Sequence, residues 1–444
     1  NHKTEKFWDK KEVDKAVANI CDEAVAVNVK KTEKNLSPPA PFNTTSFLAA
    51  AANQGLSPAN AMRIAEGLYM KGFISYPRVD NTVYPKSINF RDILTALEGT
   101  DKLGALAKKI NAQTKLEPTR GKRMATDHPP IHPTAAVRKD AVSERDWKIY
   151  ELIVRRFLAN LAPKAKIASV RIDFDANNEP LYIRGSQTKS PGWLEFYPYG
   201  KRKDNPVPDI CKGDKVKIIE KIVEAKETQP PARYSQSSLI QKMEELNLGT
   251  KATRHNIIKN LYDRGYTHND PVIPTDLGIA VADTLNKYAN KISSPEMTAE
   301  LEAEMNNIAQ GNSKQEEVVD RSRQILAKTL VELSTKKEEV GQQIRAGILE
   351  SQTLGKCPNS EGNLRIIRSK KTRKRFVGCS DYPDCKTTYP LPQYGEIIPL
   401  GEICPECGSP KIKVINKGKR PWTICIDPNC ITKDEYKKSK KNTK

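Results

Sequence analysis

The sequence Gly-Phe-Ile-Ser-Tyr-Pro-Arg-Val-Asp-Asn at residues 72–81 follows a helical pattern that begins with Ser-Pro at residues 57–58. Serine before proline is typical of a helix start, and the glycine is a typical stop. Pro77 disfavours helical backbone at Tyr76, so we expect a turn from helix to strand that presents the phenol. In extended backbone the side chains of residues i and i+2 point to the same side, which would place Arg78 beside Tyr76. A nearby cation lowers the pKa of a phenol and binds phosphate, so the pair is a candidate nucleophile with its electrostatic partner. The alternative is a structural corner.

The longer string at residues 72–84 resembles the active-site signature of type IA DNA topoisomerases, most closely the archaeal and topoisomerase III-like branch. The resemblance implies that Tyr76 attacks a DNA phosphodiester and becomes attached to the 5′ phosphate. One strand is then passed through the break and the bond is resealed without ATP. In this scheme Arg78 stabilises charge on the transferring phosphoryl group, which is the dominant contribution in such reactions.

A second stretch, Asp-His-Pro-Pro-Ile-His-Pro-Thr at residues 127–134, places two histidines in a proline-rich loop. A histidine in such a loop can hydrogen-bond a phosphate oxygen, and a purely structural loop is the alternative. The stretch is similar to the family's His-x-x-Ile-x-Pro-Thr motif. The resemblance implies that His128, and not His132, lies near the scissile phosphate as a further catalytic residue.

The composition favours a nucleic-acid partner. The chain has 444 residues, enough for two to four domains, and a formal net charge of +20. Residues 356–444 hold 20 Lys and Arg against 9 Asp and Glu, so +11 of the excess lies in the last fifth. A polyanionic partner is expected, with nucleic acid ahead of an anionic membrane surface. The sequence shows neither a membrane-spanning apolar run nor a signal-peptide pattern, so we expect a cytoplasmic, nucleoid-associated protein without a membrane partner.

The periodicity predicts an α+β multidomain protein with a mainly helical core. Residues 1–40 are helix-compatible to about residue 26 and then lysine-rich and irregular, as expected for the end of an upstream arch or helical segment. Alternating apolar residues at 168–174 and further runs at 181–183 and 216–222 predict an antiparallel β segment. Charged helical periodicity at 316–350 predicts one long helix.

The order of these segments is that of the type IA topoisomerase core, and the string Pro-Phe-Asn-Thr-Thr-Ser at 41–46 resembles the family's opening of the tyrosine domain. We therefore expect the following domains: a tyrosine-bearing domain at 41–162 that closes with a helix at 146–161, a β-rich gate arch at 163–233, a helical domain that holds single-stranded DNA at 234–350, a degenerate zinc finger at 355–392, a zinc finger at 401–432 and a basic tail at 433–444.

Residues 248–254, Leu-Gly-Thr-Lys-Ala-Thr-Arg, separate two helical patterns. A helix N-terminus that carries threonine, lysine and arginine can bind phosphate, while a helix-turn-helix corner without a ligand is the alternative. The string resembles the family's Gly-x-x-x-Thr-Arg segment. The resemblance implies that Lys251, Thr253 and Arg254 hold the backbone of single-stranded DNA, with single-stranded regions of negatively supercoiled DNA as the substrate.

Seven of the nine cysteines lie after residue 356, which indicates metal binding rather than disulfides in an intracellular basic protein. The spacing Cys-x2-Cys, 17 residues, Cys-x4-Cys predicts a four-thiolate zinc site brought together by a β-hairpin. A second module resembles the topoisomerase zinc-finger consensus but has Ser360 where a second cysteine should follow the first, so it predicts a weaker zinc site or none. The expected zinc ligands are Cys404, Cys407, Cys425 and Cys430 in the first site, and Cys357, Cys379 and Cys385 in the second.

The resemblance covers nearly all 444 residues in the family's order. The family's toprim domain, with its catalytic glutamate, lysine and acidic Mg²⁺ cluster, has no counterpart. We therefore expect the larger C-terminal part of a type IA topoisomerase, inactive by itself, with Mg²⁺ supplied through the toprim domain. That domain is either carried by a separate chain or absent through truncation or processing. The alternative is a helix-turn-helix plus zinc-ribbon module that binds DNA without catalysis.

Overall fold

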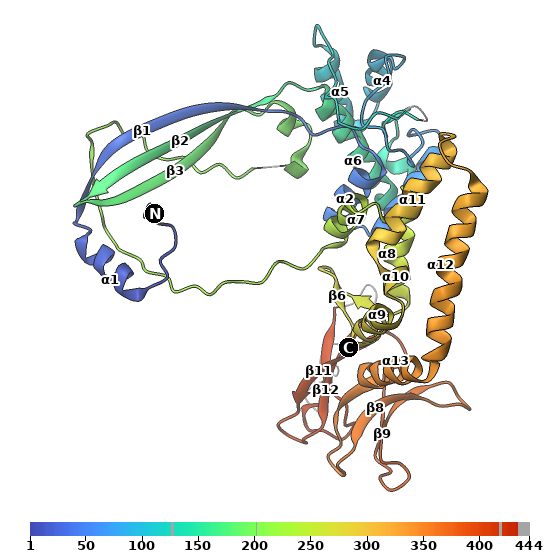
Figure 1. Ribbon diagram of the computed structural model, residues 1–444. Coiled ribbons are helices and arrows are strands. Elements are labelled where there is room, and N and C mark those ends of the chain that lie inside the picture. The colour runs from blue at the N-terminus through green and yellow to red at the C-terminus, as the bar shows by residue number, and fades with distance from the viewer. Residues whose placement is uncertain (126–127, 201, 417–419, 434–444) are drawn as a thin grey trace. The chain divides into compact units, whose positions relative to one another are not determined.

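The computed structural model describes residues 1–125, 128–200, 202–416 and 420–433 (Figure 1). The chain divides into two compact units, residues 1–259 and residues 260–444. No helix within these described ranges is long and apolar enough to cross a membrane. From residue 434 onward, the expected basic tail lies outside the described residues.

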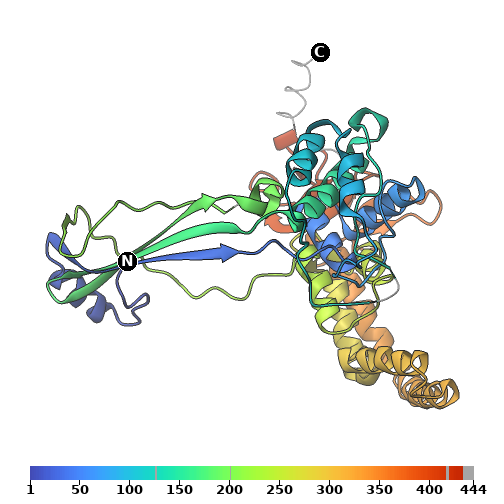
Figure 2. The ribbon, with the colours of Figure 1, turned by 90° about the horizontal axis from the view of Figure 1, so that it is seen from above.

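A four-stranded antiparallel sheet with strand order β3-β2-β1-β4 forms one part of the first unit. Three strands are long: β1 (Glu23–Leu36), β2 (Ala165–Ala176) and β3 (Glu179–Ser190). They form a ribbon that extends away from the helices of residues 44–161, and the helix α1 (Lys10–Asn19) lies at its far end (Figures 1 and 2). The short β4 (Lys215–Lys217) pairs with the start of β1, so the regular strand expected at 216–222 is shorter than predicted.

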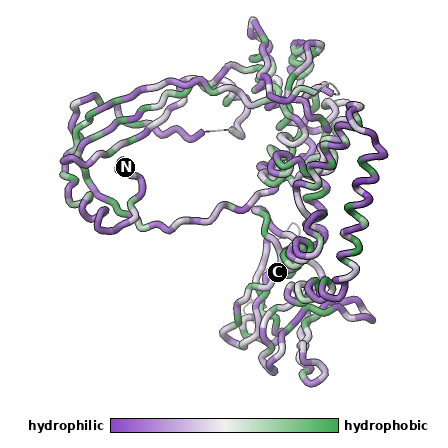
Figure 3. The backbone as a smooth tube through the Cα atoms, in the orientation of Figure 1, coloured by the Kyte–Doolittle hydropathy of each residue, from purple (hydrophilic) through white to green (hydrophobic). Residues whose placement is uncertain are grey.

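Hydrophobic and hydrophilic residues alternate along these strands (Figure 3). The apolar side chains form a cluster on one face, made of Ala24, Ala26, Ile172, Phe174 and Ala176. The strand predicted at 168–174 is therefore confirmed. The irregular segment predicted after residue 26 is wrong, because β1 pairs with β2 as far as Leu36. A lysine-rich strand is tolerated here because this part of the ribbon is exposed on both faces: the consecutive Lys30 and Lys31 point to opposite faces and both are exposed.

Helices from the segment 44–111 pack against α6 (Glu144–Leu161), which begins two residues before the predicted start. Ser143 caps it by accepting a hydrogen bond from the N–H of Asp146. Ile149, Ile153 and Phe157 of α6 are fully buried. The other helices of this unit are α1 (Lys10–Asn19), α2 (Thr44–Asn53), α3 (Pro58–Met70), α4 (Phe90–Leu97), α5 (Asp101–Asn111), α7 (Gln236–Glu245) and most of α8 (Arg254–Asp263), with short 3₁₀ turns at Lys139–Ala141, Gly192–Glu195 and Pro198–Gly200.

The second unit begins with a short hairpin and a set of helices. The long helix predicted at 316–350 is wrong, because α12 ends at Thr335 and α13 starts again at Lys337. α13 packs on α9 so closely that a Cβ atom at Gly347 would lie 2.2 Å from the Cβ of Ala280. The change of direction follows from this packing, which charge periodicity does not encode. The elements are β5 (Thr267–His268), β6 (Ile273–Pro274), α9 (Asp276–Tyr288), α10 (Asn290–Ser293), α11 (Pro295–Ala309), α12 (Gln315–Thr335) and α13 (Lys337–Gln352).

Two small antiparallel sheets complete this unit, with strand orders β10-β9-β8-β7 and β11-β12-β13. They share one hydrophobic core, in which Leu364 and Val377 of the first sheet lie with Ile412 and Val414 of the second. The strands are β7 (Thr353–Lys356), β8 (Asn363–Arg368), β9 (Arg375–Cys379), β10 (Thr388–Pro390), β11 (Glu396–Ile403), β12 (Pro410–Ile415) and β13 (Trp422–Cys425).

Candidate active site and metal centres

The helix end before Tyr76 forms as the sequence predicts, but the expected strand does not: within residues 71–89 Ile74 makes an isolated β-bridge with Pro133 and no regular strand forms. Pro58 is the first residue of α3, and the helix ends at Met70. Gly72 follows with φ of +74°, a left-handed conformation that glycine adopts without strain and that reverses the chain. Tyr76 is partly exposed. Its ring meets two others, Tyr69 edge-on at 5.3 Å and His128 at 4.8 Å between ring centroids.

Thr44, the first residue of α2, fixes this turn from the inside. Its buried hydroxyl accepts a hydrogen bond from the N–H of Val79 at 2.7 Å and donates to the carbonyl of Pro77 at 2.8 Å. The backbone N–H of Thr44 also donates to the carbonyl of Val79 at 2.9 Å. These bonds hold the residues that flank Arg78 to the start of α2. The sequence string at 41–46 suggested this segment, but not its contact with the tyrosine turn.

The histidine loop is held against the same turn. Ser75 donates its N–H to the carbonyl of His132 at 2.9 Å, and its hydroxyl accepts the N–H of His132 at 3.0 Å. The side-chain amide of Asn81 donates to the carbonyl of His128 at 3.2 Å. The two histidines differ in environment: the side chain of His128 is exposed beside Tyr76, whereas His132 is buried near Phe157. Burial lowers the pKa of His132. The position Asp127 of this motif lies outside the described residues.

Arg78 has a partner that the sequence did not indicate. Glu66 on α3 accepts from its guanidinium at 2.6 Å and 2.8 Å. His255 of α8 is buried close to this ion pair, and burial together with the charge of Arg78 lowers its pKa. Its Nδ1 has no hydrogen-bond partner among the described residues. Glu66 and Arg78 lie 12 positions apart on different elements, so no local pattern could have paired them.

The loop at residues 248–254 is joined to the tyrosine turn by an ion pair of 3.4 Å between the ammonium of Lys251 and Asp80. Arg254 is buried, and its guanidinium donates to the carbonyls of Leu248 at 3.1 Å and Gly249 at 2.9 Å. Thr253 accepts the N–H of Thr250 at 2.9 Å through its hydroxyl. Of the three residues predicted to bind DNA, Lys251 contacts the tyrosine turn, while Arg254 contacts the carbonyls of its own loop and the hydroxyl of Thr45.

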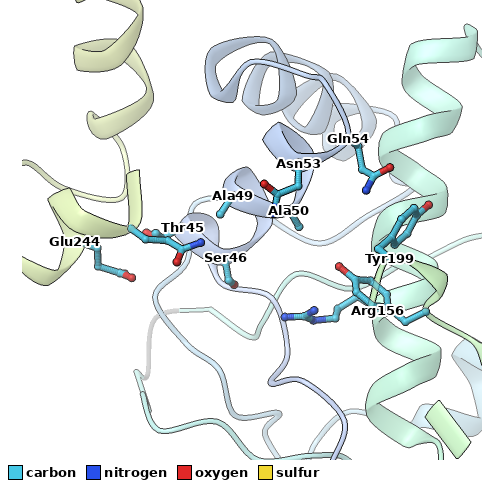
Figure 4. A pocket seen from close by; sticks show the side chains of 11 residues that line it. Thr45, Ser46, Ala49, Ala50, Asn53, Gln54, Arg156, Tyr199 and Glu244 are labelled. Carbon is cyan, nitrogen blue, oxygen red and sulfur yellow. The ribbon is translucent and has the colours of Figure 1, made fainter. Parts of the chain in front are cut away.

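A cavity of about 470 Å³ lies beside α2, and its lining does not include Tyr76 or His128 (Figure 4). Thr45 and Ser46 of α2, Arg156 of α6 and Tyr199 contribute to its wall. The Arg156 guanidinium lies over the ring of Phe42 at 4.3 Å, and burial lowers its pKa. The cavity is therefore a polar recess separate from the candidate nucleophile.

The predicted zinc ligands form two clusters in the second unit, one of Cys404, Cys407, Cys425 and Cys430 and one of Cys357, Cys379 and Cys385. Within each cluster the sulfur atoms lie within 4.8 Å of one another. The sulfurs of Cys404 and Cys430 are 3.6 Å apart, and those of Cys407 and Cys425 are 3.3 Å apart. Tetrahedral zinc with Zn–S bonds of about 2.3 Å requires sulfur separations of about 3.8 Å, so the donor sets fit zinc.

Hydrogen bonds shift one cysteine of each cluster towards the thiolate form, while burial raises the pKa of Cys407 and Cys425. The Thr432 hydroxyl lowers the pKa of Cys430 to about 7, and the Thr387 hydroxyl lowers that of Cys385 to about 6. Thiolates are the species that bind zinc. The short β-hairpins expected from the cysteine spacing are present, since Cys404 and Cys407 lie in the turn between β11 and β12.

Two family models match this chain: one described as DNA topoisomerase over residues 1–320, and one described as topoisomerase DNA-binding C4 zinc finger over residues 354–394. DNA topoisomerase 1 of Archaeoglobus fulgidus is 42% identical over 419 residues, which cover 94% of this chain and 62% of that protein. DNA topoisomerase 1 of Thermoplasma acidophilum is 41% identical and covers 90% of this chain and 51% of that protein. The chain thus spans between half and two thirds of the length of these relatives.

The solved structure of full-length topoisomerase I from Thermotoga maritima has the same fold. The TM-score is 0.60 at 22% sequence identity, with 94% of this chain and 65% of that chain covered. The predicted α+β architecture with C-terminal zinc-ribbon modules is confirmed by this likeness and by the zinc-finger match.

Proposed function

The chain belongs to the type IA DNA topoisomerase family, and on that basis we propose that Tyr76 is the nucleophile that opens one DNA strand. The observation that carries this proposal is the position of the phenol. Tyr76 lies partly exposed on a turn that Thr44 and Ser75 hold rigid, with the ring of His128 at 4.8 Å. A reactive group needs such a fixed geometry to approach a phosphorus atom in line.

In the proposed reaction the phenol oxygen bonds to phosphorus and the bond to the 3′ oxygen breaks. The phenol proton leaves, and the departing 3′ oxygen takes up a proton. The phosphotyrosine keeps the bond energy, so the 3′ hydroxyl can reverse the step after another strand has passed, without a nucleotide cofactor. His128 and Arg78 hydrogen-bond the non-bridging oxygens, where charge develops in the transition state. Glu66 holds the Nε edge of the Arg78 guanidinium, which leaves the remaining Nη1 group for the phosphate.

The loop at 248–254 is proposed to hold single-stranded DNA beside this turn. Lys251 supplies the charge, and its ion pair with Asp80 places it next to the tyrosine stretch. Thr253 orders the loop through Thr250, and Arg254 fixes the loop backbone from the inside. The formal charge of +20 supports a polyanionic partner, and single-stranded regions of negatively supercoiled DNA are the proposed substrate.

The four-thiolate cluster would hold zinc, which would stabilise the ribbon. Magnesium is a different case. The described residues offer two groups of three or more side chains able to hold a metal ion, and both consist of cysteines, which do not fit Mg²⁺. We propose that Mg²⁺ and the acid and base groups come from a toprim domain, in the same polypeptide or in a partner chain, and that residues 1–444 by themselves do not relax DNA. The proposed place of action is the nucleoid in the cytoplasm.

The test is a trapped covalent adduct. A single-stranded oligonucleotide labelled at its 3′ end is incubated with the chain, Mg²⁺ and a toprim-containing polypeptide from the same source, and then denatured. A 5′ phosphotyrosine leaves the 3′-labelled fragment on the protein, whereas a 5′-labelled oligonucleotide yields only free fragment. Peptide mapping of the adduct must return Tyr76.

Two variants separate the nucleophile from its surroundings. Tyr76→Phe must abolish the adduct while DNA binding stays within about twofold, because only the attacking oxygen is removed. Tyr69→Phe is the matched control, since it removes the same atom from the neighbouring ring and must retain the adduct. An adduct on the Tyr76→Phe protein would show that the nucleophile is wrongly assigned. Binding without any adduct in the complete mixture would favour a DNA-binding module without catalysis.

A further inference from the structure

Ser360 occupies a metal-ligand position in the three-cysteine module at residues 354–394. It follows Cys357 by three residues, the spacing at which Cys407 follows Cys404. Its hydroxyl oxygen lies 3.2 Å from the sulfur of Cys379. Within the same cluster the sulfurs of Cys357 and Cys385 are 3.8 Å apart, which is the separation that tetrahedral zinc requires.

The backbone around Ser360 is folded as it is around a thiolate ligand. The N–H two residues later, on Gly362, donates to the Ser360 oxygen at 3.2 Å. The same bond from residue i+2 reaches the sulfur of Cys379 from Asp381 at 3.5 Å, and that of Cys407 from Ser409. The loop therefore presents an oxygen where the four-thiolate ribbon presents a sulfur.

No other side chain of the described residues takes the fourth place. Carboxylates of Asp381 and Asp384 line the neighbouring cavity, yet the group of mutually close ligand atoms contains only the three sulfurs. That cavity, about 650 Å³, is also lined by Ser360 and Cys385 and makes the fourth position reachable from outside. A neutral hydroxyl binds zinc far more weakly than a thiolate, so it leaves the position free for exchange.

We propose that residues 354–394 bind Zn²⁺ through Cys357, Cys379 and Cys385 and keep the fourth coordination position open to a small exogenous donor. Water fills this position by default, and a low-molecular-weight thiol replaces it, because thiolate is the stronger ligand for zinc. The cluster of Cys404, Cys407, Cys425 and Cys430, with four thiolates, is closed. The two sites in one chain therefore differ in ligand exchange, and this difference is independent of whether Tyr76 cleaves DNA.

Cobalt(II) is the probe, because its d–d absorption reports the number of sulfur ligands. The full chain is stripped of metal under reducing, thiol-free conditions and titrated with Co²⁺, and 2-mercaptoethanol is then added. We expect two Co²⁺ per chain and a saturable shift of the absorption bands on thiol addition. X-ray absorption spectroscopy at the zinc edge of the zinc-loaded chain, without added thiol, should give about 3.5 sulfur ligands per metal, the mean of three and four.

Two variants at one position make the result decisive. Ser360→Cys completes a fourth thiolate and must bind two Co²⁺ without any response to 2-mercaptoethanol. Ser360→Ala must still bind two Co²⁺ and respond to 2-mercaptoethanol, because the fourth ligand is water or the added thiol and not the Ser360 hydroxyl. The proposal is overturned if the wild-type chain binds one Co²⁺ and Ser360→Cys binds two, since the three-thiolate site is then empty. It is also overturned if added thiol leaves the wild-type spectrum unchanged, or if Ser360→Ala loses the second metal ion.

Discussion

The hydroxyl of Thr44 is predicted to determine how firmly the tyrosine turn is held. Thr44→Val keeps the shape of the side chain and removes the hydroxyl, which leaves the buried N–H of Val79 and the carbonyl of Pro77 without this partner. Each such loss costs about 1–2 kcal/mol, so local opening of the turn becomes easier by about 2–4 kcal/mol. Thr44→Ser is the matched control, because it keeps the hydroxyl and loses one buried methyl group, worth about 1 kcal/mol.

The assay is amide hydrogen exchange of the peptide at residues 73–84, because a chain of two units has no single unfolding free energy. At tenfold per 1.4 kcal/mol, Thr44→Val should speed exchange of this peptide by about 30- to 700-fold. Thr44→Ser should speed it by less than about tenfold. The yield of the covalent adduct at Tyr76 should fall with Thr44→Val only. Equal exchange rates in the two variants would refute the idea that this hydroxyl anchors the turn.

Three further outcomes are expected. Burial lowers the pKa of His132, so the folded state holds its neutral form, and the stability of the first unit should fall as pH drops below the ordinary histidine value of about 6.5. The free energy of urea unfolding is measured from pH 7.5 to 5 with a probe in the first unit. His132→Gln should make this free energy depend less steeply on pH, and an unchanged pH dependence would contradict the role of His132. Lys251→Ala should reduce the slope of log K against log[salt] for single-stranded DNA binding by about 0.7. Lys102→Ala on α5 is the control. An equal change in the control would rule out a specific contact of Lys251 with DNA. Cys404→Ser should remove about one zinc ion per chain by elemental analysis, and Cys211→Ser, an exposed cysteine outside both clusters, should remove none.

Short-range signals in the sequence were sufficient for much of the fold. The serine and proline before α3 and the glycine after it set the limits of the helix that precedes Tyr76. Alternation along residues 168–174 identified a strand. Charge periodicity at 316–350 identified helical structure but missed the break at Lys336, because that break follows from how α13 packs on α9.

The sequence-based prediction was wrong for a strand whose pairing partner is distant in the chain. The lysine-rich stretch before Leu36 has no pattern of its own that favours a strand, and it is ordered by β2, which lies more than 100 residues later in the chain. Strand propensity depends mainly on the neighbouring strand and the solvent, so a single segment carries little of that information.

By itself the sequence determined the chemistry available to this protein: a tyrosine on a rigid turn, two candidate histidines, a basic loop and two cysteine modules with a serine in one of them. These features depend on residue type, spacing and backbone restriction within about ten neighbours. The tertiary structure alone decided which groups meet. It paired Arg78 with Glu66 and joined Lys251 to Asp80, two contacts that no motif indicated, and it placed the ring of His128, which the motif had singled out, beside Tyr76. The physical reason is that such contacts depend on how whole helices and strands pack, and packing is a property of the folded chain rather than of any one stretch.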